Sequence, residues 1–416
     1  MRKPECMEEV YALKKGEIIR VNGPAHVTLK TGRIRIGGSD RSRFIIKEGK
    51  SCTVEGIQQS QVEIRLGSGG KIFHDGDIPM PPRMWLKHAH EILQKKGTVM
   101  ILGAPDTGKT TFATFLANQA LEKGILPAII DSDIGQSDIG PPATIGLAFP
   151  THAIERLSDI DADEFYFVGT TSVHHVCDMV IGLLHLVKKA RERSELVIID
   201  TCGYVHGEIG RRLKHTKLQA IQPDIVAALQ RKGELYPILR SWRGPVIEVA
   251  VPPDIRKVPR RTRKELRQIR WSKAFSQAQD RQIDLEEKTL LNTYLLSGKK
   301  IDRDIFKKLL QEDVIHAEEI PEGFFIVKKD TFHEYQPPPV TISGSTLRVL
   351  DAGWEENLVV GLIRDGTCVD MGIVKKINYP SMMAVISCRE HDFDSISFGR
   401  VKVDESGYET GFIPWC

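Results

Sequence analysis

One stretch of the chain has the residue types and spacing to hold a nucleoside triphosphate. Residues 103–111, GAPDTGKTT, match the spacing G-x-x-x-x-G-K-[ST]. In such a loop the glycines let backbone N–H groups turn onto phosphate oxygens, and the following helix N-terminus adds positive potential. The lysine reaches the β- and γ-phosphates, and the next hydroxyl ligates Mg²⁺. We therefore expect a phosphate-binding loop made of Gly103, Ala104, Pro105, Asp106, Thr107, Gly108, Lys109, Thr110 and Thr111.

Acidic residues follow two apolar runs that resemble buried strands. The run ILPAII leads into Asp131, Asp133 and Gln136, and the run LVII ends at Asp200. In parallel sheets, ligands bind beyond the carboxyl ends of the strands, so these residues should face the loop. Phosphoryl transfer needs a carboxylate that holds Mg²⁺ and one that accepts a proton from the attacking hydroxyl. Asp133 and Asp200 are both candidates, and Asp131 is either a brace for the loop or a simple strand-end cap.

Further candidates lie where other strands are expected to end. The run EFYFVG is followed by the hydroxyls of Thr170, Thr171 and Ser172, which could contact phosphate oxygens. Tyr204 follows the run that ends at Asp200 and could stack on a base, because an aromatic face accepts any base. A single aromatic residue of this kind is, however, more often part of ordinary packing.

A basic segment covers residues 256–273, RKVPRRTRKELRQIRWSK, in which nine Lys or Arg residues accompany a single Glu. Arg263, Arg267 and Arg270 have the spacing of one helix face. Such a face could stabilise transferring phosphate charge or contact a nucleic-acid backbone. The alternative is a solvated basic surface without a ligand.

The elements that must position these residues follow a pattern of buried strands alternating with helices. Apolar runs at 98–103, 125–131, 164–169, 195–200, 224–229 and 246–251 are typical of strands covered on both faces of a parallel sheet. Segments 110–123 and 172–193 have helical periodicity and could form the crossovers. Residues 86–290 are therefore predicted to form an α/β domain with a mostly parallel, doubly wound sheet.

Both ends of the chain have the alternation of smaller β-rich domains. Residues 1–85 contain short segments of period two and end in a Pro-rich stretch at 77–85, which we interpret as a linker. Residues 291–416 contain a charged helical segment and then further strands, with turn signals at 364–366 and 405–407.

Composition excludes several classes of protein. Of the 416 residues, 41% are hydrophobic and 27% charged, which is typical of a globular protein. The seven cysteines form no C-x-x-C pair and their number is odd, which favours reduced thiols in a cytoplasmic protein. We see neither a signal-peptide pattern nor an apolar run of membrane-spanning length. An N-K-x-D element, which reads guanine in GTPases, is also absent from the sequence.

Five pieces together resemble the P-loop polynucleotide 5′-hydroxyl kinases, a family that includes the pre-mRNA cleavage-complex kinase, ribosomal RNA processing kinases, and archaeal and bacterial relatives. They are GAPDTGKTT, DSDIGQSDIGPPATIG, VGTTS, IIDTCGYV and the Arg-rich segment near 260–270. The resemblance implies an archaeal or bacterial member. It also implies transfer of the γ-phosphate of ATP, or of another NTP, to the 5′-hydroxyl of RNA or DNA with Mg²⁺.

The resemblance assigns roles to individual residues. Lys109 and Thr110 match the phosphate and Mg²⁺ residues, and Asp133 matches the acid that activates the hydroxyl and holds metal-bound water. Gln136 matches the adjoining glutamine of that motif. Thr171 matches the clasp that grips the substrate phosphate, and the face from Arg263 to Arg270 resembles a mobile lid.

Two positions depart from the family pattern. Val173 stands where the clasp usually has proline, and Tyr204 stands where some relatives have tryptophan. Two other readings of the whole chain remain open: a nucleotide-bound scaffold of an RNA-processing complex that transfers nothing, and an NTPase that needs no polynucleotide acceptor.

Overall fold

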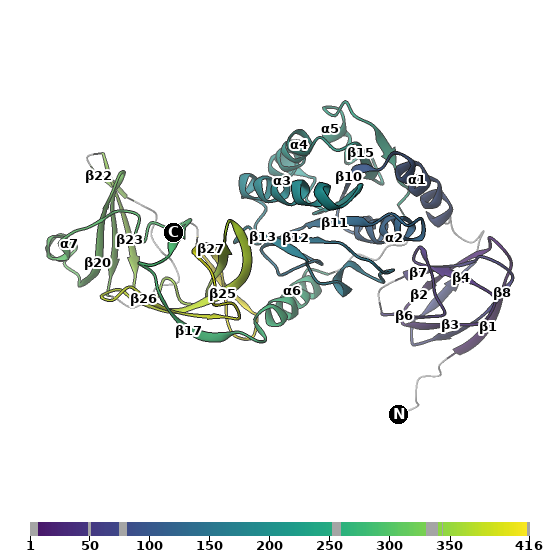
Figure 1. Ribbon diagram of the computed structural model, residues 1–416, viewed down its shortest axis with the longest axis horizontal. Helices are drawn as coiled ribbons and strands as arrows, with labels where there is room; N and C mark the ends of the chain where they lie inside the picture. Colours follow the sequence, from purple (N-terminus) through teal and green to yellow (C-terminus); the bar gives the residue numbers. More distant parts are fainter. Residues whose placement is uncertain are drawn as a thin grey trace. The chain divides into compact units, whose positions relative to one another are not determined.

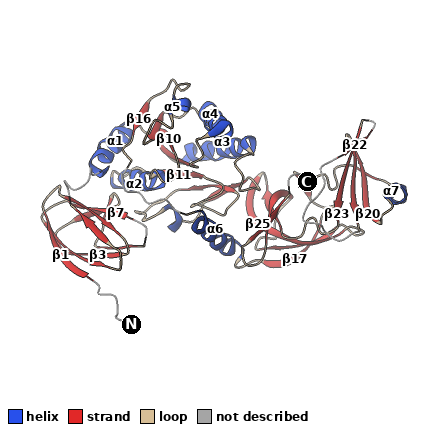
Figure 2. Cartoon of the chain, turned by 180° about the vertical axis from the view of Figure 1, so that it is seen from behind, coloured by secondary structure: helices blue, strands red, loops and turns tan. Residues whose placement is uncertain are grey.

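The computed structural model describes residues 7–48, 51–74, 81–251, 259–329, 340–342 and 344–413 (Figures 1 and 2). Contacts divide the chain into two compact units. The first unit contains Met1–Asp133, Gly146–Asp163 and Met179–Val258, and the second contains Ile134–Ile145, Glu164–Asp178 and Pro259–Cys416. The division into domains at 85 and 290 stays a prediction.

The N-terminal part of the first unit consists of two antiparallel sheets, as the alternating pattern predicted. One sheet has the order β1 (Met7–Leu13), β8 (Ser60–Leu66), β3 (Ala25–Thr31) and β6 (Arg43–Ile46). The other has the order β5 (Ser39–Asp40), β4 (Ile34–Ile36), β7 (Ser51–Gly56), β2 (Ile18–Asn22) and β9 (Lys71–Phe73). The inward side chains, among them Val21, Val27, Val54 and Ile64, form one apolar core.

A parallel sheet forms the centre of the first unit. Its strands are β16 (Val246–Glu248), β15 (Ile225–Leu229), β10 (Gly97–Gly103), β14 (Leu196–Thr201) and β11 (Pro127–Ser132), in that order. β12 (Thr144–Ala148) continues the sheet antiparallel to β11. Every residue of β11, β14 and β15 is buried, which explains the unbroken apolar runs.

Helices cover both faces of this sheet (Figure 1). They are α1 (Pro81–Lys95), α2 (Lys109–Glu122), α3 (Val176–Arg193), α4 (Gly207–Ile221) and the short α5 (Tyr236–Leu239), with a 3₁₀ turn at Leu157–Asp159. Helix α2 connects β10 to β11, passing over β14. Helix α4 connects β14 to β15 in the opposite direction along the sheet, passing over β10. Because parallel crossovers are right-handed, α2 and α4 lie on opposite faces. The predicted doubly wound α/β fold is confirmed.

Two boundaries differ from the sequence predictions. Helix α1 already begins at Pro81, inside the stretch interpreted as a linker, because proline is accepted in the first turn of a helix. Trp85 of this helix packs edge-on against Phe112 and Phe115 of α2. The rest of that stretch, 77–80, lies outside the described residues. Helix α3 begins at Val176 rather than at residue 172.

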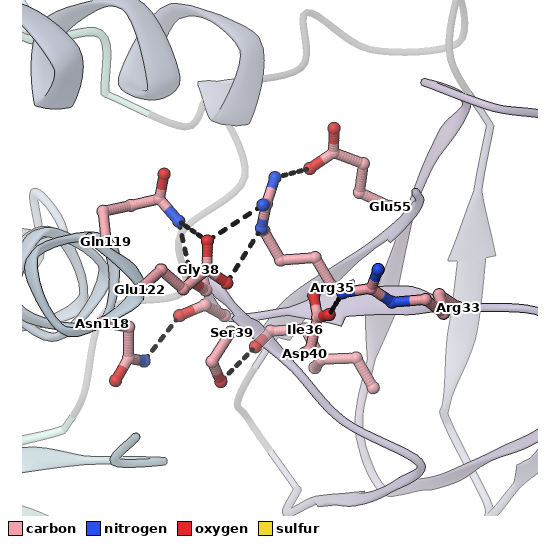
Figure 3. Close-up of polar contacts among 11 residues, drawn as sticks. Arg33, Arg35, Ile36, Gly38, Ser39, Asp40, Glu55, Asn118, Gln119 and Glu122 are labelled. Atoms are coloured by element: carbon pink, nitrogen blue, oxygen red, sulfur yellow. Dashed lines mark hydrogen bonds and ion pairs between the residues drawn. The ribbon is translucent and has the colours of Figure 1, made fainter. Parts of the chain in front are cut away.

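The N-terminal sheets are fastened to α2 by polar contacts (Figure 3). Asn118 Nδ2 donates to Gly37 O at 2.9 Å and Gln119 Nε2 donates to Gly38 O at 2.8 Å. Arg35 forms two hydrogen bonds to the carboxylate of Glu122, at 3.3 and 2.9 Å. The β4–β5 turn therefore lies directly on the helix that follows the phosphate-binding loop.

The second unit is dominated by antiparallel strands. One sheet has the order β13 (Glu164–Phe167), β25 (Thr367–Asn378), β24 (Leu358–Arg364), β27 (Ser395–Val403) and β18 (Thr289–Leu291), with β26 (Met383–Cys388), β17 (Gln279–Asp284) and β28 (Glu409–Phe412) attached. The other has the order β19 (Lys299–Lys300), β20 (Val314–Ile320), β21 (Gly323–Lys328), β23 (Ser345–Asp351) and β22 (Val340–Ile342). The helices of this unit are α6 (Arg260–Phe275) and α7 (Arg303–Leu310). Both predicted turn signals, at 364–366 and 405–407, join neighbouring antiparallel strands.

One strand prediction was wrong. We expected the run at 164–169 to form a parallel strand; β13 follows β12 in the strand order of the sheet, but it pairs antiparallel with β25 through Phe165 and Cys368. Phe165 and Phe167 of this run belong to an apolar cluster with Trp271 and Met371. In the part of the chain that is described, no helix combines the length and apolarity needed to cross a membrane.

Candidate active site

The phosphate-binding loop occupies the turn between β10 and α2. A side chain at Gly103 would place its Cβ 2.5 Å from Thr107 Oγ1 and 2.7 Å from Leu229 O, so only glycine fits there. Gly108 has a φ of 92° and caps the N-terminus of α2 in the left-handed region, which favours glycine. The two glycines of the motif are therefore needed for different reasons. Gly103 allows a close approach of neighbouring atoms, and Gly108 allows the backbone to turn.

Lys109 is folded back over the loop. Its Nζ donates to Ala104 O at 2.8 Å, and its side chain is largely buried. Burial lowers the pKa of Lys109, and the nearby carboxylate of Asp200 acts against that shift. The ammonium group thus already lies within the loop that a phosphate would enter.

Thr110 and Asp200 form a hydroxyl–carboxylate pair beside the loop. Thr110 Oγ1 donates to Asp200 Oδ2 at 2.6 Å. Asp200 is buried near the end of β14, where it lies in register with Ile101 of β10 and Asp131 of β11. Hard oxygen donors of this kind suit Mg²⁺, which is usually held by one or two carboxylates together with substrate phosphates. Within the described ranges we find no group of three or more His, Cys, Asp or Glu side chains that could bind a metal by itself.

The second acidic motif is shaped by its own first aspartate. The backbone N–H of Asp133 donates to Asp131 Oδ1 at 3.0 Å, and Asp131 is buried. This hydrogen bond caps the strand end and also holds the turn that carries Asp133. Asp133 is only partly buried, at the end of the strand that neighbours the strand of Asp200.

Two lysines behind these loops are not among the site residues predicted from the sequence. Lys214 and Lys217 of α4 are both 0% exposed. Lys217 Nζ donates to Ser132 Oγ at 3.0 Å, and Lys214 Nζ donates to Cys202 O at 2.5 Å. Their spacing of three with Leu218 and Ile221 places them on the inner face of the helix, and this spacing was the available signal. Lysine is so rarely buried that neither residue stands out in the sequence as part of a site.

The loop after β14 lies against the phosphate-binding loop. A Cβ on Gly203 would come within 2.6 Å of the backbone N of Pro105, so the two backbones touch. Next to this contact, Tyr204 is 40% exposed. An aromatic ring in this position is available to a ligand, as the stacking hypothesis requires.

The predicted clasp belongs to the second unit and follows β13. Thr170 is fully buried, and its Oγ1 accepts the N–H of Ser172 at 3.1 Å, which closes the turn. Thr171 and Ser172 are partly exposed. Of the three hydroxyls, Thr170 therefore has a structural task, whereas Thr171 and Ser172 are accessible from solvent.

The three arginines of the basic segment do share one partly buried face of α6. Arg267 binds Glu409 through two hydrogen bonds, of 2.7 and 2.9 Å, and also donates to Gly135 O at 3.3 Å. Arg270 forms an ion pair with Asp138. Residues 256–258 of the segment lie outside the described residues. Arg267 and Arg270 are thus held by carboxylates in this conformation.

Gln136 also belongs to the second unit and lies beside α6. Its Nε2 donates to Gly135 O at 2.8 Å and to Arg263 O at 3.4 Å. The predicted residues are therefore gathered in two sets. The set in the first unit consists of Lys109, Thr110, Asp133 and Tyr204. The set in the second unit consists of Gln136, Thr170, Thr171, Ser172, Arg263, Arg267 and Arg270.

A phosphate-binding loop at the carboxyl end of a central parallel strand, with its lysine, threonine and strand-end aspartate, defines a P-loop nucleotide-binding protein. Residues 103–277 match the family model described as mRNA cleavage and polyadenylation factor CLP1 P-loop. The polyribonucleotide 5′-hydroxyl-kinase of Pyrococcus abyssi is 34% identical over 354 residues, covering 83% of this chain and 98% of that protein. The polyribonucleotide 5′-hydroxyl-kinase of Methanocaldococcus jannaschii is 33% identical over 332 residues, covering 77% of this chain and 91% of that protein.

The chain belongs to this polyribonucleotide 5′-hydroxyl-kinase family of ATP-using P-loop proteins. The fold agrees with a solved structure of Clp1p in complex with Pcf11p, with a TM-score of 0.61, 10% identity, and coverage of 96% of this chain and 99% of that one. At that identity the agreement concerns the fold alone.

Proposed function

We propose that this chain transfers the γ-phosphate of ATP to the 5′-hydroxyl end of RNA with the help of Mg²⁺. The observation that carries the proposal is the group formed by Lys109, Thr110 and Asp200, with Asp133 at the end of the neighbouring strand. The first three are the parts that hold a triphosphate, and Asp133 supplies a carboxylate that a hydroxyl acceptor needs.

Nucleotide binding would use the loop as it stands. The N–H groups of residues 103–111 would surround the phosphates, and Lys109 would exchange Ala104 O for a phosphate oxygen. Thr110 and Asp200 would hold Mg²⁺, the Asp200 carboxylate accepting the hydroxyl of Thr110 already. Mg²⁺ held there would supply positive charge that neutralises the charge developing on the phosphates.

Asp133 is proposed as the base that accepts the proton of the attacking 5′-hydroxyl. Its backbone N–H is held by Asp131, so the main chain that carries the carboxylate is fixed at this turn. Its partial exposure leaves it accessible to an acceptor, whereas the buried Asp200 is engaged with Thr110. This division of labour favours Asp200 for the metal and Asp133 for the proton.

Residues of the second unit are proposed to bind the acceptor and stabilise the transferring phosphate. Thr171 would contact the phosphate group of the acceptor, Tyr204 of the first unit would stack on its terminal base, and Gln136 would contact the phosphates or metal-bound water. Arg263, Arg267 and Arg270 would supply the positive charge of a lid. For Arg267 this requires an exchange of Glu409 for phosphate oxygens.

A panel of acceptors tests the proposal. The protein is incubated with ATP and Mg²⁺ together with RNA or DNA oligonucleotides that carry either a 5′-hydroxyl or a 5′-phosphate. We expect label on the 5′-hydroxyl RNA and none on the same RNA with a 5′-phosphate. Comparison with the DNA oligonucleotides shows whether the sugar of the acceptor matters. ATP consumption that ignores the 5′ end would favour a plain NTPase. Retained, unhydrolysed ATP with no transfer would favour a scaffold.

A further inference from the structure

Two fully buried lysines lie on the inner face of α4, three residues apart. Lys217 Nζ donates to Ser132 at the end of β11, at 3.0 Å to Oγ and 3.3 Å to the carbonyl O. Lys214 Nζ donates to Cys202 just after β14, at 2.5 Å to O and 3.4 Å to Sγ. Each lysine is therefore fastened to one of the two strand ends that carry the acidic residues.

Such burial is unfavourable unless the protein gains something from it. Moving an ammonium group out of water costs several kcal/mol. An uncharged side chain of the same length at this position would avoid that cost. The pKa of Lys217 is lowered to about 8, chiefly by burial and also by the charge of Lys214, while Cys202, Asp133 and Asp131 act in the opposite direction. The two cations thus lie in the field of the aspartates at the site.

The atoms that the lysines hold are close in sequence to the reacting groups. Ser132 precedes Asp133, and its Oγ also donates to Asp200 O at 2.9 Å, so Ser132 links the two strand ends and Lys217 holds Ser132. Cys202 precedes Gly203, whose backbone touches Pro105 of the phosphate-binding loop. A shift of either lysine would move a loop that borders the nucleotide.

We propose that Lys214 and Lys217 are positioning residues for phosphoryl transfer, which hold the Ser132–Asp133 and Cys202–Gly203 turns in the arrangement that the reaction needs. The proposal deepens the function proposed above and rests on it. Neither lysine touches a substrate: Lys217 acts through Ser132 on Asp133, and Lys214 acts through Cys202 on the loop at Pro105. Displacing a reacting group by about 1 Å is enough to slow a reaction on the order of 10²-fold.

The test compares Lys217→Met with Leu218→Ala in the full chain. Methionine keeps the length and packing of the side chain but removes the charge and the donors. Leu218 is the adjacent buried residue on the same helix and donates nothing to either turn, so its truncation controls for general loss of stability. At a temperature where all variants are folded, Lys217→Met should lower kcat by on the order of 10²-fold with KM for ATP changed by less than about 3-fold.

A second readout separates this inference from the kinase activity itself. Hydrogen exchange should become faster at residues 132–135 in Lys217→Met and stay at the wild-type rate there in Leu218→Ala. If the wild-type chain transfers no phosphate, the proposed function fails while hydrogen exchange still decides on positioning. Equal kcat losses in both variants with unchanged exchange at 132–135 would overturn the inference. Should Lys217→Met not fold, Lys217→Arg, which keeps the charge but not the length, should show the same selective loss.

Discussion

At the scale of single residues, the site separates two carboxylates that the sequence could not tell apart. Asp200 is engaged by Thr110 at 2.6 Å, whereas Asp133 is partly exposed and anchored by Asp131. The sequence predicted the loop at 103–111 because all of its parts are consecutive. The roles of Asp133 and Asp200 depend on side chains that meet only after strands β10, β11 and β14 pair, and spacing along the chain does not contain that information.

This separation predicts different losses for two conservative substitutions. Asp133→Asn removes the proton acceptor and should lower kcat by about 10²- to 10⁴-fold while leaving ATP affinity near the wild-type value. Asp200→Asn should weaken Mg²⁺-dependent ATP binding as well as transfer. Measuring ATP affinity and kcat in both variants checks this. Equal ATP affinity in the two variants would contradict the assignment.

The burial of Lys217 predicts a pH dependence of stability. Its pKa is about 8 in the folded chain and near the ordinary lysine value after unfolding, so between those values the unfolded state binds more protons. The penalty of burying this residue is therefore complete below about pH 8 and disappears as the pH rises toward 10.5. Relative to Lys217→Met, the wild type should gain up to about 3 kcal/mol of unfolding free energy over that interval. Urea unfolding of both proteins at pH 7.5 and pH 10 measures the difference, and a constant difference would refute it.

At the scale of elements, helix α6 shows how much of a pattern is local. The spacing of Arg263, Arg267 and Arg270 correctly predicted a shared helix face. Their carboxylate partners Glu409 and Asp138 lie 142 and 132 residues away in sequence, so no local pattern could predict them. The same reason explains the error at β13, whose partner β25 lies some two hundred residues further along the chain.

If α6 acts as a lid, two of its arginines should differ in how much they contribute to phosphate transfer. Arg267→Ala should slow transfer by at least about 10³-fold, as loss of a transition-state arginine does elsewhere, and weaken ATP binding much less. Arg261 is exposed and pairs only locally with Glu265 four residues on, so Arg261→Ala should stay within about 2-fold of the wild type. Equal losses of transfer and ATP affinity in Arg267→Ala would instead make it a ground-state anchor.

At the scale of the whole molecule, the N-terminal sheets are joined to the helix that begins in the phosphate-binding loop (Figure 3). Asn118 of α2 is nearly fully buried and bonds Gly37 O, Ile154 O and Ile154 N, each at 2.9 Å. The sequence predicted a separate small β-domain but gave no sign of where it would attach. An asparagine in a helical pattern looks the same whether it faces water or a neighbouring turn.

This attachment predicts an unequal effect of two neighbouring substitutions. Asn118→Ala leaves buried backbone groups without their partner and should cost about 2–3 kcal/mol of unfolding free energy. Glu122→Ala removes a more exposed ion pair with Arg35 at the same contact and should cost less than about 1 kcal/mol. Urea denaturation of the full chain gives both values. Similar costs for the two variants would show that Asn118 contributes no more than a surface contact.

We infer that the loop around Lys109 holds the phosphate that is transferred to a hydroxyl end. The most direct measurement is single-turnover transfer of labelled γ-phosphate from ATP to a 5′-hydroxyl RNA, comparing the wild type with Lys109→Ala. We expect label on the RNA 5′ end with the wild type. For Lys109→Ala we expect a rate lower by at least about 10²-fold, because a charge that stabilises the transition state is lost. Wild-type and Lys109→Ala proteins that label the RNA equally, or not at all, would contradict it.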